Sequence, residues 1–276
     1  MKKMKRLTFC LALAAVLMAG CNHEPKVFAT HTLSGGRCYL QIFDEPFIMD
    51  LDTIGTKMTF SVAWPDEGMV SPSALRELQY LYFDDSTSVD VETAVKGWLA
   101  NPFYEDEGNL QEVESIDEER PHSYYSLEGS CTQDSALAVF TAKTELYSVG
   151  AAHGLYTVRY LTVDKETGNV IHLPDLVTDT NLLCEAIAHA IQDLDANKET
   201  RECLFDEFKD VDRMPLPSNF VIDSARNNIT VLYGLYEITP YCCGIQEITL
   251  PIFWLSKHVP LTPYAKRLFG EGCSIE

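Results

Sequence analysis

Strand-like and helix-like spacings of apolar residues are interspersed along the chain, and most strand-like segments come in neighbouring pairs. Residues 123–131 and 136–147 are rich in apolar and β-branched side chains and flank a short polar turn, which predicts a β-hairpin. Residues 155–163 and 170–173 flank a turn containing Gly168, which suits a positive φ, and predict a second hairpin. Both pairs indicate antiparallel strands.

Helical spacing of apolar residues marks several other segments. A helix is predicted to begin at Ser71, where a proline suits the first turn and leucines follow at helical spacing. Residues 89–100 predict a second helix, and residues 182–194 predict a third, with Asp179 or Thr180 as its cap. Two shorter helices are predicted at residues 199–208 and 264–269.

The remaining strand-like segments complete the predicted fold. They are residues 38–43, 57–64, 229–236 and 245–250. Hairpins interleaved with helices, in place of regular strand–helix alternation, indicate an α+β fold with an antiparallel sheet and packed helices.

The first residues have the features of a bacterial lipoprotein signal peptide. Four basic residues precede the apolar run 7–18, which is shorter than the ~20 residues that a membrane-spanning helix needs. Small residues then precede Cys21, where we expect cleavage and attachment of lipid. The alternative is an ordinary secretory signal in which Cys21 occurs by chance. Residues 1–20 are therefore the predicted signal peptide, and residues 21–30 the lipidated tether to the cell envelope, in the periplasm or at the cell surface.

A single globule is expected from residue 31 to residue 276. Its first part, residues 31–104, is separated from residues 121–276 by a strongly acidic segment, residues 105–120, with eight acidic residues and one basic residue. Mutual repulsion favours a solvated, mobile loop there. A docking surface for a basic ligand is the alternative interpretation of the same charge.

The net charge of the whole chain is also strongly negative. It has 41 acidic and 21 basic residues, a net charge of −20, and loss of the four basic residues of the signal peptide leaves −24. Binding to nucleic acid depends on neutralising phosphates with Lys and Arg, so the composition argues against a nucleic-acid partner. A basic partner, or none, fits the charge better.

The cysteines leave two interpretations open. Seven remain after the signal peptide and Cys21 are set aside, and either disulfides or small buried thiols account for them. Cys242 and Cys243 are adjacent and cannot easily pair with each other. The spacing of cysteine and histidine matches no zinc motif, so we expect no metal and no cofactor.

Two stretches resemble a known family. Residues 147–176 contain tyrosine, glycines, Ala-His-Gly, a strand, a Thr-Gly turn and Leu-x-Asp-Leu, and residues 236–251 contain a matching pair of closing strands. Both resemble the extracellular RsiV-like domain of a lysozyme-sensing anti-sigma factor, which also accompanies some peptidoglycan deacetylases. Ala151 replaces a usual glycine, and Cys242 and Cys243 stand where small residues are common.

The resemblance directs attention to specific residues. The binding residues predicted from it are Tyr147, Ser148, His153 and Tyr156 in the first stretch. The charge of the acidic segment adds Glu112, Glu114 and Asp117. His153 has three possible roles: a hydrogen bond to loop carbonyls that would otherwise lack a partner, a ligand contact, or a catalytic base.

The resemblance implies binding rather than catalysis. With only six residues before the apolar run, we expect no cytoplasmic sigma-binding segment, and no deacetylase motif is present. We therefore expect a lipid-anchored envelope binding domain, with a lysozyme-like basic protein or a peptidoglycan fragment as ligand. A hydrolase and a structural subunit of an envelope complex are the alternatives, although the chain contains no recognisable catalytic motif.

Replacing Cys21 tests the predicted anchor. Cys21→Ser removes the thiol that would carry lipid, so the protein should leave the membrane fraction or accumulate as an uncleaved precursor. Fractionation and gel mobility measure both outcomes. Normal processing together with unchanged membrane retention would contradict the prediction.

Overall fold

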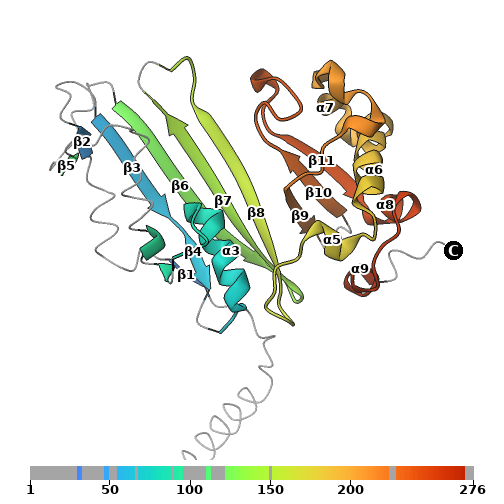
Figure 1. Ribbon diagram of the computed structural model, residues 1–276, viewed down its shortest axis with the longest axis horizontal. Helices are drawn as coiled ribbons and strands as arrows, with labels where there is room; N and C mark the ends of the chain where they lie inside the picture. The colour runs from blue at the N-terminus through green and yellow to red at the C-terminus, as the bar shows by residue number, and fades with distance from the viewer. Residues whose placement is uncertain are drawn as a thin grey trace, which may run out of the picture.

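Two sheets, each with its own hydrophobic core, organise the structure (Figure 1). This computed structural model describes residues 30–32, 47–49, 55–65, 68–88, 90–91, 93–95, 110–112, 122–148, 151–223 and 228–270. The predicted signal peptide, most of the tether and the predicted strand 38–43 lie outside the described residues. Among the described residues, no helix has the length and apolarity needed to cross a membrane.

The larger sheet has six strands in the order β5-β2-β3-β6-β7-β8. Their bounds are β2 Phe47–Met49, β3 Gly55–Ser61, β5 Leu110–Glu112, β6 His122–Gln133, β7 Leu137–Tyr147 and β8 Leu155–Asp164. The predicted hairpin is confirmed, because β6 pairs with β7 in antiparallel register, and β8 continues the meander. A separate antiparallel pair joins β1, Thr30–Thr32, to β4, Ala63–Pro65.

Two features of this sheet differ from the sequence-based expectation. Strand β3 pairs with β6 in parallel, which the long connection through a helix between them permits. The acidic segment also contributes β5, which pairs with β2 at the edge of the sheet, so residues 110–112 are a strand rather than a mobile loop. The rest of that segment, residues 105–109 and 113–120, lies outside the described residues.

The second predicted hairpin is only partly formed. Gly168 has the expected positive φ of 71°, but the returning chain pairs through a single bridge, Val163 to Val170. Helix α5, Leu173–Leu176, replaces the predicted strand end. The Asp175 carboxylate accepts the His172 backbone N–H at 2.8 Å, which favours a helical turn there.

Helix α3, Pro72–Phe83, covers one face of the larger sheet (Figure 1). Ser71 caps it as predicted, accepting the Ala74 backbone N–H at 3.2 Å. Tyr82 is completely buried against the sheet, and a Cβ on Gly129 would lie 2.6 Å from its ring. A side chain at residue 129 would therefore displace this helix. Residues 91 and 93–95 of the predicted second helix are helical, and Ala94 and Val95 are buried.

The smaller sheet has three antiparallel strands in the order β11-β10-β9. Their bounds are β9 Asn219–Asp223, β10 Asn228–Tyr233 and β11 Gln246–Pro251. The packed helices are α6 Thr180–Asp193, α7 Lys198–Cys203, α8 Ile252–His258 and α9 Pro263–Phe269. The described loops of this part contain the 3₁₀ turns η2 Asp195–Asn197, η3 Asp206–Phe208, η4 Val211–Arg213 and η5 Tyr241–Cys243. The α+β fold class is confirmed, whereas β9 and α8 were not predicted.

The two sheets meet where the edge strand β8 lies beside the edge strand β9 (Figure 1). The Asn219 side chain donates to the Val158 carbonyl at 2.6 Å and accepts the Tyr160 backbone N–H at 3.0 Å. A second link is the Tyr264 hydroxyl, which donates to the Asp164 carboxylate at 2.7 Å. Side-chain hydrogen bonds therefore connect the two sheets, because β8 and β9 do not pair through backbone hydrogen bonds.

Candidate binding site

The two stretches that carry the family resemblance meet in an aromatic cluster, defined as His153, Tyr156, Tyr236 and Tyr241. His153 lies in the loop between β7 and β8, and its ring stacks on that of Tyr241 with centroids 3.8 Å apart. Tyr236 and Tyr241 lie between β10 and β11, with ring centroids 5.7 Å apart. Residues more than 80 positions apart in sequence therefore form one surface.

Hydrogen bonds fix the orientation of the His153 ring. Its Nδ1 lies 3.0 Å from the Gly154 carbonyl oxygen, and its Nε2 lies 3.2 Å from the Tyr236 hydroxyl. The neutral tautomer with a proton on Nδ1 satisfies both contacts, because Nδ1–H donates to the carbonyl and Nε2 accepts from the hydroxyl. Of the three roles considered for His153, the geometry supports the hydrogen bond to a loop carbonyl.

Glycine at residue 244 leaves room for the cluster. Gly244 has a φ of 72°, and a Cβ there would lie 2.9 Å from the Tyr156 hydroxyl oxygen. Tyr236 itself has a φ of 65°, which is uncommon for a residue with a side chain. The loop between β10 and β11 thus adopts an unfavourable backbone conformation at the residue whose ring projects most.

Much of this end of the molecule is exposed apolar surface. Tyr236 is 54% exposed, and Tyr124, Leu155 and Tyr156 are between 37% and 45% exposed. Tyr124 on β6 stacks on Tyr147 on β7, with ring centroids 5.8 Å apart. We call Tyr124, Tyr156 and Tyr236 the exposed aromatic face. Leu155 precedes Tyr156 in β8 and points to the opposite face of the sheet. Clustered exposure of large apolar side chains is typical of a binding surface.

A cleft between the two sheets lies next to this face. Its volume is about 440 Å³, within the range of small-ligand sites, and the polar residues along it include Glu77, Tyr80, Arg159, His172, Asn219 and Glu237. Its walls are otherwise largely apolar and come from α3, β8 and β9.

The two acidic side chains of the cleft, Glu77 and Glu237, have different hydrogen-bonding or charged partners. The Glu77 carboxylate lies 3.4 Å from His172 Nε2 across the cleft wall. The Glu237 carboxylate accepts the Gly234 backbone N–H at 2.7 Å and remains exposed. Of the two, Glu237 follows Tyr236 in sequence and places negative charge beside the tyrosine rings.

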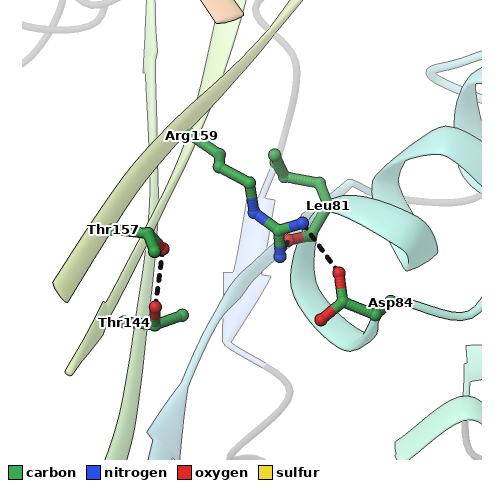
Figure 2. A network of polar contacts seen from close by, with 5 residues as sticks. All are labelled: Leu81, Asp84, Thr144, Thr157 and Arg159. Atoms are coloured by element: carbon green, nitrogen blue, oxygen red, sulfur yellow. Dashed lines mark hydrogen bonds and ion pairs between the residues drawn. The ribbon is translucent and has the colours of Figure 1, made fainter. Parts of the chain in front are cut away.

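Arg159 supplies the positive charge of the cleft, but its guanidinium group is already engaged (Figure 2). It donates to the Asp84 carboxylate at 2.7 Å and to the Leu81 carbonyl at the end of α3. Both contacts stabilise the C-terminal end of the helix, where cations are favourable. Nearby, the hydroxyls of Thr144 and Thr157 hydrogen-bond across β7 and β8 at 2.6 Å.

The structure brings together some of the predicted binding residues and separates others. Tyr147, Ser148, His153 and Tyr156 all lie at the ends of β7 and β8 and in the loop between them. Glu112 lies in β5, the edge strand opposite to β8 in the six-stranded sheet. The usual spacing of neighbouring strands puts these two edges about 24 Å apart. Glu112 is therefore not part of the same site. Glu114, Asp117 and the lipidation residue Cys21 lie outside the described residues.

Sequence reasoning missed Tyr124, Tyr236 and Tyr241 as site residues. Tyr236 and Tyr241 belong to the second matching stretch, near Gly244, and this is the signal that could have identified them. Nothing local in the sequence shows which distant loop they contact. Within the described residues, no group of three or more His, Cys, Asp or Glu side chains could hold a metal ion.

Comparison with known proteins identifies a domain of unknown function. The family described as "Protein of unknown function (DUF3298)" matches residues 174–252. The match covers the second resembling stretch and begins near the end of the first. Residues 174–252 are thus similar to a DUF3298 domain. No curated protein matches the chain.

A solved structure of a DUF3298 protein has a similar fold. A family member from Bacteroides fragilis is 18% identical and superimposes with a TM-score of 0.56, covering 87% of this chain and 96% of that one. A DUF3298 protein from Pseudomonas aeruginosa is 13% identical, with a TM-score of 0.48 and coverage of 87% and 97%. The first similarity establishes a common fold and nothing about function.

Removing one hydroxyl tests how the cluster is held together. The Tyr241 hydroxyl donates to the Gly154 carbonyl at 2.7 Å, so Tyr241→Phe should lower the free energy of unfolding by about 1 kcal/mol while keeping the ring stack. Urea unfolding measures the change. Tyr156→Phe is the matched control on the same surface, and an equal effect of both variants would contradict the assigned hydrogen bond.

Proposed function

We propose that this protein is a lipid-anchored binding domain of the cell envelope whose ligand contacts the exposed aromatic face. The aromatic cluster carries the proposal, because it joins two distant loops into one exposed surface. Tyrosine rings provide large, rigid contact area at low entropic cost, which is why they are enriched at interfaces. The anchor on Cys21 would keep this surface at the membrane.

The chemistry of the surface favours a basic protein as the ligand. Glu237 lies in the loop with Tyr236, and Glu145 pairs across β7 and β8 with Tyr156. Tyrosine rings and carboxylates together accommodate Lys and Arg side chains through cation–π contacts and ion pairs. The expected charge of −24 after cleavage would speed the approach of a basic partner.

The resemblance to the RsiV-like domain supports the same class of ligand. That domain receives lysozyme in an anti-sigma factor, so a lysozyme-like basic protein is the leading candidate here. A hydrolase is less well supported, because both ring nitrogens of His153 are engaged by Gly154 and Tyr236 and are not directed at a nucleophile. A peptidoglycan fragment is the alternative ligand, and the binding experiment distinguishes it from a basic protein.

Substitution of Tyr236 tests the binding surface. Tyr236→Ala should weaken binding to a lysozyme by about tenfold or more, which corresponds to about 1.4 kcal/mol, because it removes the most exposed ring of the face. Surface plasmon resonance against a panel of lysozymes and soluble peptidoglycan fragments measures affinity. Phe253→Ala is the matched control, because Phe253 is 53% exposed on α8.

Salt and the acidic segment separate the two ligand classes. For a basic protein, affinity should fall between low and physiological salt, where charges are screened over about 8 Å. At low salt, where screening is weak, the triple variant Glu112→Ala, Glu114→Ala and Asp117→Ala should slow association without greatly changing dissociation. Binding to no lysozyme at low salt would contradict the proposal. Salt-independent binding of a peptidoglycan fragment would replace it with a cell-wall role.

A further inference from the structure

Three cysteines from two separate segments gather beside the aromatic cluster. Cys203 ends α7, and Cys242 and Cys243 lie in η5, directly after Tyr241. The sulfur atoms of Cys242 and Cys243 are 4.0 Å apart, and Cys203 and Cys243 interact through their thiols. Cys242 is exposed and the other two are partly buried, so reagents in solution can reach the group. We call these three residues the thiol cluster.

Hydrogen bonds on both sides of α7 hold Cys203 in place. Before the helix, the buried Asn197 side chain accepts the Thr249 backbone N–H at 3.2 Å and donates to the Thr249 carbonyl at 3.4 Å. After the helix, the Phe205 backbone N–H donates to the Ile238 carbonyl at 3.0 Å. The end of α7 is therefore tied to the chain that leads into Cys243.

We propose that Cys203 and Cys243 form a disulfide that ties α7 to the loop carrying Tyr236 and Tyr241. Pairing of Cys242 with Cys243 is disfavoured by geometry. Adjacent Cα atoms are about 3.8 Å apart, whereas disulfides usually span Cα distances of about 4.4–6.8 Å. Cys203 approaches from another element and is free of this restriction. The disulfide would form outside the cytoplasm, in the exported protein that the signal peptide predicts.

The bond forms by exchange with a disulfide-containing oxidant, either a protein or a small molecule. The Cys203 thiolate attacks one sulfur of the oxidant, forms a mixed disulfide and releases the first thiol of the oxidant. The Cys243 thiolate then attacks the Cys203 sulfur and releases the second thiol. Two protons and two electrons pass to the oxidant, and one sulfur–sulfur bond replaces another.

The neighbouring thiols influence each other. A hydrogen bond with the Cys203 side chain is the main cause that raises the pKa of the Cys243 thiol to about 12. Capture of Cys203 by the oxidant removes that influence. Cys243 can then ionise more easily and complete the bond.

Peptide mapping of the full-length protein tests the pairing. The protein is extracted from membranes in detergent, its thiols are alkylated in acid without reduction, and it is digested with trypsin. We expect peptide 202–209, which contains Cys203, to be covalently joined to peptide 227–257, which contains Cys242 and Cys243. Cys242→Ser should keep this joined species, and Cys243→Ser should abolish it. Cys184→Ser on α6 is the matched control and should also keep it.

Thermal unfolding gives an independent measurement of the same bond. The disulfide closes a loop of about 40 residues, so reduction should lower the Tm of the wild-type protein by about 5–10 °C and leave that of Cys203→Ser unchanged. The proposal is overturned if Cys203 is recovered alkylated, or joined to Cys38, Cys273 or Cys242, or if reduction shifts both Tm values equally. These outcomes do not depend on whether the aromatic face binds a ligand.

Discussion

The structure depends on how the backbone hydrogen-bonding groups at the free edge of β8 find partners. An edge strand presents backbone N–H and C=O groups without a neighbouring strand. Here the Asn219 side chain accepts the Tyr160 backbone N–H and donates to the Val158 carbonyl of β8. Asn219 is the first residue of β9, so the same contact sets the position of the smaller sheet. With β9 in place, the loop between β10 and β11 reaches the loop between β7 and β8. The aromatic cluster and the cleft both follow from this one junction.

The site that results is suited to binding more than to chemistry. His153 holds two loops together, and Arg159 in the cleft wall stabilises the end of α3. What remains exposed is tyrosine rings and carboxylates, which are groups that recognise a surface. The thiol cluster would add a covalent tie behind the same loop. Stability and recognition are thus concentrated at neighbouring positions in the fold.

Local sequence patterns predicted the elements that depend on residues close together in the sequence. The β6–β7 hairpin, the cap of α3 at Ser71 and the positive φ of Gly168 each depend on a few neighbouring residues. The parallel pairing of β3 with β6 depends on residues far apart and left no local signal. The same holds for the site: the Ala-His-Gly loop was found from sequence, but its partners Tyr236 and Tyr241 become visible only once Asn219 has joined the two sheets.

Amide hydrogen exchange at Tyr160 tests the junction most directly. If Asn219 holds the edge of β8, then Asn219→Ala should speed exchange of the Tyr160 amide by about tenfold, because a hydrogen bond of about 1–1.5 kcal/mol is lost. The β8 amides that face β7 should keep their protection in the same sample. Equal exchange of the Tyr160 amide in the wild-type and variant proteins would contradict the account.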